Sequence, residues 1–557
     1  MPPSFPLVTA PWIGVWDLDA AASRSVGLLE ALTRAHRLVL PVDRSEAVVV
    51  LRLLAAVLDA ACGPRETAEW DAAWRSPALD ADAVTAYLDR YADRLDLFHP
   101  EHPAFQSGQL TEYARGPEAL HPGSLAGEAG QWFNEELRGP LAPLPAERAA
   151  PWLLHLLAYD VAGIKRAAPG DPAGRAGKLY GAQLGPLASA THLHLTGPGL
   201  SLKDVLLLNL PPQPRATGDA PVWERGTPDL PVRTRAATGR LDLLTWPNRR
   251  VRLHATDEGL VDAVAHHDGD RLDDTWPTVQ RLDPMTAWGT GSTGALVPLR
   301  FLNAQSWPQS WRAAEHLDQP GTCRAVDHAA AAAERGTLNA GQIVQAVVST
   351  TVYSNLHKTT ISDIPVAVMP LAAAGLLADP DAREGIAAMA RYADILGGRL
   401  RKHAMQVSHR SSDQVAPRML LTDVDRDWEA AVRGYGDDPE AARAGWEAAL
   451  HREAERRIEE FPLRESERRQ LLAIYATSLS QRPARAKRSS SRQTAPAKKR
   501  GPVADRHEVF GRSYTLSELS RHPECVVSYA TLRKRVAEGW DVKEAATTPG
   551  RRGPATT

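Results

Sequence analysis

SEAVVVLRLLAAVLDAAC, residues 45–62, is apolar around almost its whole circumference when it is drawn as a helix. A helix that is apolar on every side belongs inside a protein core. Ser45, at the start of the stretch, has a side chain suited to cap the helix. We therefore expect a buried helix over residues 45–62, with the rest of the N-terminal region packed around it.

Strand-like and helical segments alternate around this helix. Apolar spacing predicts helices over residues 25–38, 80–98 and 146–164. Short apolar or alternating runs predict strands over residues 11–17, 191–197, 204–210, 241–246, 250–256 and 295–301. The stretches 111–140 and 165–186 are rich in Gly and Pro, and we expect long loops there. Residues 1–370 are thus predicted to form a mixed α/β domain.

The remaining chain changes character twice. Residues 377–482 contain four amphipathic segments with short joins, the pattern of a four-helix bundle. Residues 483–507 are rich in Pro, Ser, Ala, Lys and Arg without an apolar period, which predicts a basic flexible linker. Residues 508–557 are predicted to be a small helical unit of the helix-turn-helix type. The expected fold class is α+β.

Composition narrows the functional classes. The 557 residues are 43% hydrophobic and 24% charged, as is ordinary for globular proteins. No run of eighteen apolar residues and no signal-like N-terminus occur, so we expect a cytoplasmic location and no membrane partner. The three cysteines lie far apart without a CxxC pair, which argues against a zinc knuckle or a disulfide framework.

The net charge of −2 conceals a basic block in the linker. From Arg482 to Arg506 nine Lys and Arg residues stand against one acid, Asp505. Such blocks between folded regions are common electrostatic footprints of nucleic-acid binding. The linker therefore favours a nucleic-acid partner.

Two histidine-containing segments invite a metal or catalytic interpretation. LFHPEHPAFQ, residues 97–106, holds His99 and His102 three positions apart rather than the four of a zinc protease helix, and its prolines interrupt any helix. We expect a structural turn there. AHHDGDRLDD, residues 265–274, is expected to be an exposed polar turn; its candidate ligands are His266, His267, Asp268 and Asp270.

No nucleophile elbow or phosphate-binding loop is present, and GTGSTG, residues 289–294, predicts a hairpin turn. We expect no enzyme activity, no metal and no cofactor. A hydrolase that uses His99, His102 or the 266–270 cluster is kept as a separate hypothesis.

Several segments, taken in order, resemble one family. They are SFPLVTAPWIGV (4–15), LFHPEHPAFQ (97–106), THLHLTGPGLSLKDVLLLNLP (191–211), LDLLTWP (241–247), LDPMTAW (282–288) and the C-terminal helical segments. This order is similar to the CasA family, the large subunits of the type I-E CRISPR surveillance complex Cascade. The resemblance implies a protein that recognises the protospacer-adjacent motif in double-stranded DNA, starts strand separation and recruits a helicase–nuclease, while guide pairing reads the target. The implied partners are other Cascade subunits, the 5′ handle of the guide RNA, double-stranded target DNA and the helicase–nuclease.

The resemblance also implies site residues. Contact with the guide-RNA handle and subunits falls on Trp132, Phe133 and Asn134 in GQWFNE. Contact with the adjacent motif falls on a glycine loop within PGDPAGRAGKLYG, through Gly174, Arg175, Gly177 and Lys178. The family's minor-groove lysine is missing from DPMTAWGTGSTGALVPLR, so Arg300 or a backbone contact takes its place. The family also has a wedge, a segment with a glutamine that pries apart the first base pairs of the duplex. The resemblance implies that this wedge corresponds to Asn355, Leu356, His357 and Lys358.

The last unit lies outside the family pattern. Within residues 511–553, the run SYATLRKRVAEGWDVKEAATTP (528–549) resembles small DNA-binding modules that accompany phage and homing nucleases. Thr515 with Glu518 and, later, Ser528 are predicted to cap two helices. In that arrangement Leu532, Val536 and Trp540 form the core, and DNA is faced by Tyr529, Thr531, Arg533 and Lys534. Two alternatives are a unit that binds a protein partner, and a stand-alone DNA-binding regulator in which this module supplies the specificity.

Overall fold

The computed structural model describes most of the chain. The described residues are 3–126, 141–225, 231–291, 294–299, 309–319, 321–353, 358–411, 415, 421, 423–476, 506–510, 512–520, 522, 524–527, 529–538 and 540–548. They divide into two compact units, within Met1–Arg482 and Pro483–Thr557. Each unit has its own hydrophobic core.

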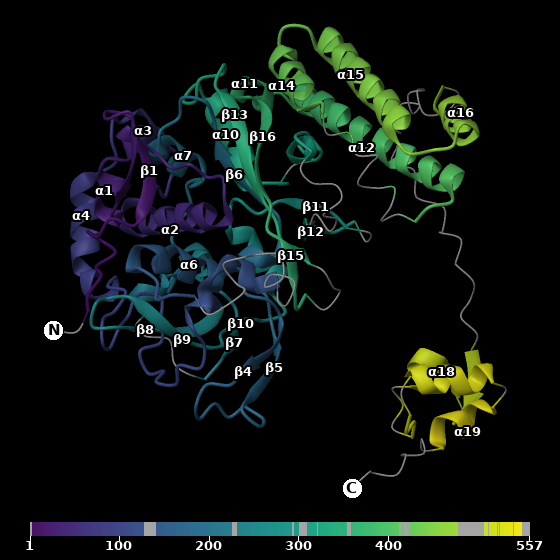
Figure 1. The fold of residues 1–557 in the computed structure, drawn as a ribbon, viewed down its shortest axis with the longest axis horizontal. Helices are drawn as coiled ribbons and strands as arrows, with labels where there is room; N and C mark the ends of the chain where they lie inside the picture. The colour runs from purple at the N-terminus through teal and green to yellow at the C-terminus, as the bar shows by residue number, and fades with distance from the viewer. Residues whose placement is uncertain are drawn as a thin grey trace. The chain divides into compact units, whose positions relative to one another are not determined.

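The predicted central helix is α2 (Ser45–Cys62), and it runs through the core of the large unit (Figure 1). The helices packed on it include α1 (Leu28–Thr33), α4 (Ala81–Arg90), α6 (Ala146–Tyr159), α7 (Leu202–Leu208) and α8 (Arg240–Leu244). Contrary to the prediction, Ser45 is not the N-cap; Arg44 holds that position, and Ser45 Oγ instead lies 2.9 Å from His155 Nε2 of α6. Its hydroxyl therefore links α2 to α6, and it also donates to Glu46 Oε2 (3.3 Å) within α2.

Within the described ranges no single helix is long and apolar enough to cross a membrane. Helix α2 meets the length and composition criteria only together with α3 (Thr67–Arg75), and a bend of 112° separates the two. Both belong to the packed core, where Trp70 of α3 is fully buried.

Two predicted strands are helices instead. Residues 204–210 belong largely to α7, because Ser201 and Asp204 form a capping box that starts a helix. Residues 241–246 belong largely to α8, whose first turn is capped from a distance: Asp219 accepts hydrogen bonds from Leu241 N (3.1 Å) and Asp242 N (3.0 Å). A short apolar run does not distinguish a buried strand from a buried helix, and the caps decide it here.

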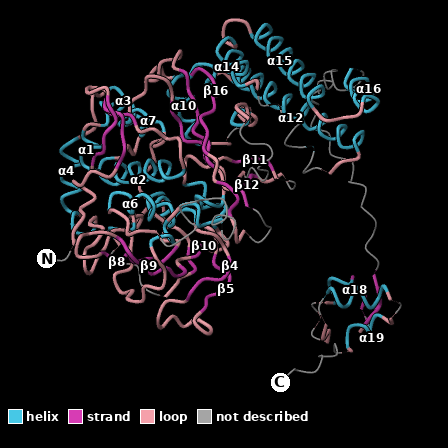
Figure 2. Tube along the Cα trace, viewed as in Figure 1, coloured by secondary structure: helices cyan, strands magenta, loops and turns pink. Residues whose placement is uncertain are grey.

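Two three-stranded antiparallel sheets flank the helical core. The first has the order β2-β1-β3 and is built from β1 (Ile13–Asp17), β2 (Ala22–Val26) and β3 (Leu38–Val39). The second has the order β16-β13-β6 and is built from β6 (His192–Thr196), β13 (Ile343–Ser349) and β16 (Val366–Ala373). Figure 2 shows the second sheet with α10 (Arg324–Glu334) beside it; α11 (Ala374–Ala378) follows β16 directly. The strand predictions for 11–17 and 191–197 are confirmed.

Paired strands make up the rest of the sheet structure. The antiparallel pairs are β4 (Gly163–Arg166) with β5 (Lys178–Ala182), β8 (Arg249–Ala255) with β9 (Val261–Asp268), β11 (Trp288–Thr290) with β12 (Leu296–Pro298), and β14 (Val352–Tyr353) with β15 (Ile361–Asp363). A parallel pair joins β7 (Thr234–Arg235) to β10 (Arg271–Leu272), and α9 (Trp276–Val279) follows. The hairpin predicted around GTGSTG is confirmed by the β11–β12 pairing. The segment predicted as a loop over 165–186 contains most of the β4–β5 hairpin instead.

Helices α12 (Pro380–Ser408), α14 (Asp425–Gly434), α15 (Pro439–Glu460) and α16 (Glu465–Ile474) occupy the C-terminal part of the large unit. Tryptophan side chains join them to the rest: Trp446 Nε1 donates to Met389 O of α12 (3.0 Å), and its ring lies 5.1 Å from that of Trp428. Trp428 Nε1 in turn donates to Pro370 O of β16 (3.3 Å). The predicted mixture of helix and sheet is confirmed.

Contrary to the prediction, the small unit is not purely helical. It opens with a hairpin of β17 (Arg506–Val509) and β18 (Arg512–Thr515), so regular structure begins inside the predicted linker. Helices α17 (Leu516–Leu519), α18 (Tyr529–Ala537) and α19 (Val542–Thr547) follow. The core comprises Val509, Leu519, Leu532, Ala545 and Ala546. Trp540, predicted to be core, is 39% exposed and lies outside this core, with Arg535 over its ring at 4.9 Å.

Candidate nucleic-acid interface

The glycine loop is the tip of the β4–β5 hairpin. Arg175 and Lys178 exchange backbone hydrogen bonds of 2.8 and 3.0 Å around Ala176 and Gly177. Both central residues have positive φ, +50° and +71°, the signature of a type I′ hairpin turn. Gly177 adopts this conformation without steric cost. The turn leaves the Arg175 and Lys178 side chains exposed on either side of the tip.

The body of the loop is held by its own bonds. Asp171 accepts from Ala173 N (2.9 Å) and from Val232 N (3.1 Å) through its carboxylate, and its carbonyl accepts from Gly174 N (3.0 Å). A Cβ on Gly174 would lie 2.9 Å from Ala167 Cβ, so the close packing there requires glycine. The four residues predicted to contact the motif are thus brought together on a fixed loop.

A buried ionic cluster anchors the hairpin from beneath. Asp160, at the end of α6, lies 3.0 Å from Lys165 Nζ of β4 and 3.1 Å from His266 Nε2 of β9, and it also bonds to Arg249 of β8. Burial alone raises the pKa of Asp160, but the charges of Arg249 and Lys165, with the hydrogen bond to His266, hold that pKa well below its usual range. Burial lowers the pKa of His266 and of Lys165. The cluster therefore ties β4 to α6, β8 and β9.

The prediction of an exposed polar turn at 265–274 is wrong. His266 to Asp268 end strand β9, and His267, Asp268 and Asp270 are buried. Several of their polar atoms have distant partners, including Ala167 O at 3.0 Å from His267 Nδ1 and Arg235 at 2.9 Å from Asp270. Burial of polar groups requires such partners, and spacing along the sequence does not reveal them.

The prediction of a structural turn at 97–106 is confirmed. His99 Nδ1 accepts hydrogen bonds from Glu101 N (3.3 Å) and His102 N (3.0 Å), so it stabilises the turn. Gln106 completes the turn by donating to Leu97 O (2.8 Å) and accepting from Leu253 N of β8 (2.7 Å). Across the described ranges no group of three or more His, Cys, Asp or Glu side chains is arranged to hold a metal ion.

Lys358, the last residue of the predicted wedge, lies at the base of the glycine-loop hairpin. Asn355, Leu356 and His357 lie outside the described residues, but Lys358 follows them with φ +56°. Lys358 O accepts a hydrogen bond of 3.0 Å from Ala162 N, immediately before β4. A Cβ on Gly163 would lie 3.0 Å from Thr359 Cγ2, so the two segments also pack closely. Two regions far apart in sequence are thereby brought side by side.

A cavity of about 280 Å³ opens where these segments meet. Its lining comprises Ala162, Ala182, Gln183, Leu184, Ser189, Leu272, Trp276 and Lys358. The mixture of an aromatic ring, an amide and a cation suits contact with nucleic acid better than a purely apolar lining would.

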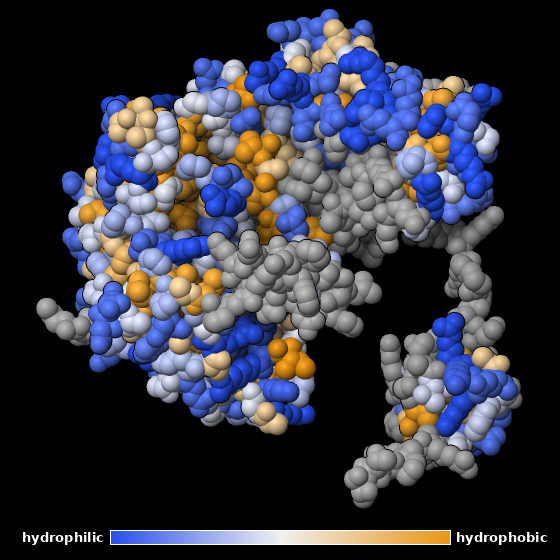
Figure 3. Space-filling view, viewed as in Figure 1, coloured by the Kyte–Doolittle hydropathy of each residue, from blue (hydrophilic) through white to orange (hydrophobic). Residues whose placement is uncertain are grey.

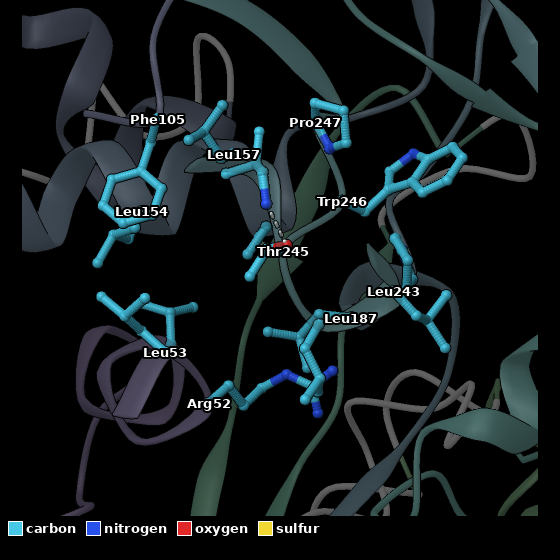
Figure 4. A pocket seen from close by; sticks show the side chains of 15 residues that line it. Arg52, Leu53, Phe105, Leu154, Leu157, Leu187, Leu243, Thr245, Trp246 and Pro247 are labelled. Carbon is cyan, nitrogen blue, oxygen red and sulfur yellow. Dashed lines mark hydrogen bonds between the residues drawn. The ribbon is translucent and has the colours of Figure 1, made fainter. Parts of the chain in front are cut away.

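A second cavity, of about 80 Å³, is apolar and lies between α2, α6 and the α8 region (Figure 4). Six of its 15 lining residues are leucines, and the bond drawn there joins Val222 N to Thr245 Oγ1 (3.0 Å). Its Arg52 is already paired with Asp283 at 2.7 Å. This cavity therefore lacks a free cation for a polyanion among its described lining residues.

The other predicted large-unit residues are not brought into this site by described contacts. Trp132, Phe133, Asn134 and Arg300 lie outside the described residues. Leu299, just before Arg300, is held by bonds from its N to Ala287 O (2.8 Å) and from Thr191 N to its carbonyl (2.7 Å). Sequence reasoning missed Lys165, Tyr180 and Arg271, which belong to the hairpin or bond to it. The signal available was the alternation of exposed and buried positions in KLYGA, residues 178–182.

In the small unit, α18 carries the predicted DNA-facing residues. Arg533 and Lys534 are exposed, and Lys534 lies 3.8 Å from Glu538 one turn on. Arg535 turns back and donates to Ala545 O at 3.0 Å, so it stabilises the unit. Thr531 is half-buried, and the side chain of Tyr529 lies outside the described part.

Comparison with known proteins gives consistent matches. The family model for CRISPR-associated protein Cse1 matches residues 6–457. The CRISPR-associated protein CasA/Cse1 of Thermus thermophilus is 34% identical over 328 residues, which span 55% of this chain and 59% of that relative's length. The crystal structure of Thermobifida fusca Cse1 superposes with a TM-score of 0.70 at 24% identity, covering 86% of this chain and 98% of that one. The structure of Thermus thermophilus CasA gives 0.64 at 25% identity (85% and 99% covered), and a chain of a CRISPR RNA-guided surveillance complex gives 0.63 at 23% (86% and 100%).

Proposed function

The chain belongs to the CRISPR-associated protein Cse1 family, and from this premise we propose that it is the large subunit of an RNA-guided CRISPR surveillance complex. Its task in this proposal is to recognise the protospacer-adjacent motif in double-stranded DNA, start strand separation and recruit a helicase–nuclease. Its partners are the other Cascade subunits, the guide-RNA handle and the target DNA. The subunit itself is non-catalytic and uses no metal or cofactor.

The observation that carries the proposal is the hydrogen bond from Ala162 N to Lys358 O. It joins the base of the glycine-loop hairpin to Lys358, the last residue of the segment proposed as the wedge. A loop with small residues lets its backbone approach base edges in the minor groove, while Arg175 and Lys178 meet phosphates. Side chains inserted between base steps unstack and kink a duplex. Motif reading and strand opening therefore belong to neighbouring elements.

The buried cluster under the hairpin supports the same task. An element that deforms DNA must resist deformation itself, which requires a locked supporting layer. The Asp160 carboxylate is 3% exposed and Arg249 is fully buried, so the cluster is shielded from solvent screening. Lys165 of β4 is fixed to this layer, and the hairpin tip is fixed with it.

The remaining contacts follow the family arrangement. We assign Trp132, Phe133 and Asn134 to the guide-RNA handle and neighbouring subunits, and Arg300 to the motif. Helices α12, α14, α15 and α16 act as the four-helix bundle that faces small subunits and the displaced strand. The contacts of Trp446 and Trp428 give this group of helices a rigid connection to the sheet.

We assign the small unit to DNA binding as an added module. Exposed Arg533 and Lys534 on α18, together with the basic linker, support phosphate contacts. Tethering raises the local concentration of such a module on the same DNA, so weak binding suffices. A stand-alone regulator is disfavoured because the Cse1 family model accounts for residues 6–457.

The test uses a guide-loaded complex, assembled with and without this chain, and duplexes with randomised flanking bases. We expect the complex with the chain to select a short flanking motif and to open the adjacent base pairs. The Arg533→Ala/Lys534→Ala variant is the matched control: it should weaken binding without changing the selected motif. Failure of the chain to join the complex, or loss of motif selection in this control variant, contradicts the proposal.

A further inference from the structure

The outward face of the β4–β5 hairpin combines apolar and basic side chains. Arg166 and Lys178 are register partners, so their side chains leave the hairpin on the same face. Ile164 and Tyr180 lie two residues from Arg166 and Lys178 along each strand, beside a register shift between Gly163 and Lys165, and all four side chains are exposed. Ile164 is 58% exposed and Tyr180 is 55% exposed. Over this hairpin Figure 3 shows an orange patch next to blue ones.

The charges on this face are incompletely neutralised. Like charges directly opposite each other destabilise a strand pair. Arg166 is paired with Glu112 at 2.6 Å, but both side chains are well exposed. Within the described residues, neither Lys178 nor Arg175 has an ion-pair partner. The face therefore carries an excess of positive charge around an uncovered aromatic ring.

The strand that carries the ring is held in place by its neighbours. Tyr180 O accepts a hydrogen bond of 3.0 Å from Arg271 Nη2, and Arg271 is paired with buried Asp268 at 2.6 Å. Leu179, the residue before it, is buried and fixes the strand from the other side. An exposed aromatic ring on a fixed strand loses little conformational entropy when a flat partner stacks on it.

We propose that this face binds an unpaired stretch of DNA, with Tyr180 stacked on a base beside Ile164 and with Lys178 and Arg175 on the flanking phosphates. The inference rests on the proposed function, in which strand opening beside the hairpin produces unpaired DNA. A base within a duplex has both faces covered by its neighbours, so only an unpaired base offers a face to the ring. Aromatic platforms in basic surroundings are the general means of binding single strands.

A protein partner fits this face less well. Two exposed apolar side chains are far fewer than a stable protein interface contains. The surrounding Arg166, Lys178 and Arg175 favour a polyanion instead. Nucleic acid is therefore the favoured occupant, and binding of a protein is an outcome that the test distinguishes.

The test measures binding of the guide-loaded complex to two substrates with the same flank, one fully paired and one with mismatched, unpaired bases next to the flank. Tyr180→Ala should weaken binding to the open substrate about 10-fold, with a smaller effect on the paired one, whereas Tyr180→Phe should keep wild-type affinity. Trp16→Ala removes another exposed aromatic, from β1, and should change neither. 2-Aminopurine in the unpaired stretch should be less quenched in complexes with Tyr180→Ala than with the wild type.

The outcomes separate the inference from the proposed function. Equal affinities of Tyr180→Ala and wild type for the open substrate overturn the inference while motif selection by the wild type stands. Loss of complex assembly in Tyr180→Ala also overturns it and makes the face a subunit contact. A wild-type complex without any flank preference contradicts the proposed function, yet a Tyr180-dependent preference for the open substrate still supports the inference.

Discussion

The two sides of the β4–β5 hairpin are built from alternate residues of the same strands, yet their environments are opposite. On the inner side, Lys165 is bound to Asp160 and Leu179 is buried. On the outer side, Ile164 and Tyr180 are more than half exposed. The inner side is fully matched within the protein and contributes stability, whereas the outer side is left for a ligand. Substitutions on the two sides should therefore differ in kind, one affecting folding and the other binding.

The largest expected effect is on the inner side. Asp160→Ala leaves the buried cations Arg249 and Lys165 without their carboxylate, and should lower the free energy of unfolding by about 3–5 kcal/mol. Urea denaturation measures the change. Glu112→Gln, which breaks the exposed pair with Arg166, is the control and should cost less than about 1 kcal/mol. If the two variants lost a similar amount of unfolding free energy, the two sides would not differ in their contribution to stability.

Lowering the pH should destabilise the folded protein because its buried histidines take up protons only when the protein unfolds. Burial lowers the pKa of His266, and it lowers the pKa of His155 in α6 to about 3. These side chains stay neutral in the folded protein but take up a proton when unfolded, so stability present at pH 7 is lost as the pH falls below the ordinary histidine pKa of about 6.5. His155 alone should remove about 2 kcal/mol of unfolding free energy between pH 7 and pH 5.

Urea denaturation at pH 7 and at pH 5 tests whether the free energy of unfolding falls with pH. In His155→Gln the loss between pH 7 and pH 5 should be smaller than in the wild type by the same amount. An unchanged loss in that variant refutes the assignment to His155.

Replacing glycine by alanine should have opposite effects on stability at the hairpin tip and in a helix. At Gly177, with φ +71°, Gly→Ala should destabilise by about 1–2 kcal/mol because an L-residue is strained there. At Gly445 in α15, where a Cβ also meets open space, the same change should stabilise by about 0.5–1 kcal/mol. Thermal unfolding of the two variants measures the difference. Changes of the same sign would show that the turn does not require its left-handed conformation.

The smallest stability effect is expected on the outer side. Lys178→Ala should change the free energy of unfolding by less than about 0.5 kcal/mol. The affinity of the Lys178→Ala variant for DNA should fall. The slope of log affinity against log salt concentration should decrease in magnitude by about 1, as expected for the loss of one phosphate contact. Arg90→Ala removes an exposed cation from α4 and should alter neither quantity. An unchanged salt slope in Lys178→Ala would remove that residue from the interface.

Local patterns were sufficient for a large part of the fold. The apolar run at 45–62 predicted α2 to the residue, and alternation predicted β1 and β6. The prolines and His99 of residues 97–106 specified a turn through short-range bonds. The order of such segments also pointed to the family, and the glycine loop was found as a candidate site. In each of these cases the deciding interactions lie within a few residues of one another.

The sequence by itself thus determined the elements whose periodicity or turn chemistry is local, together with the family and its glycine loop. Only the tertiary structure decided that residues 204–210 and 241–246 are largely helical, that His267 and Asp268 are buried, and that Lys358 borders the hairpin. The physical reason is that the partners are remote in sequence: Asp219 caps α8, Asp160 binds Arg249 across 89 positions, and Ala162 donates to Lys358. Burial and pairing of polar groups follow from such contacts, and no local pattern encodes them.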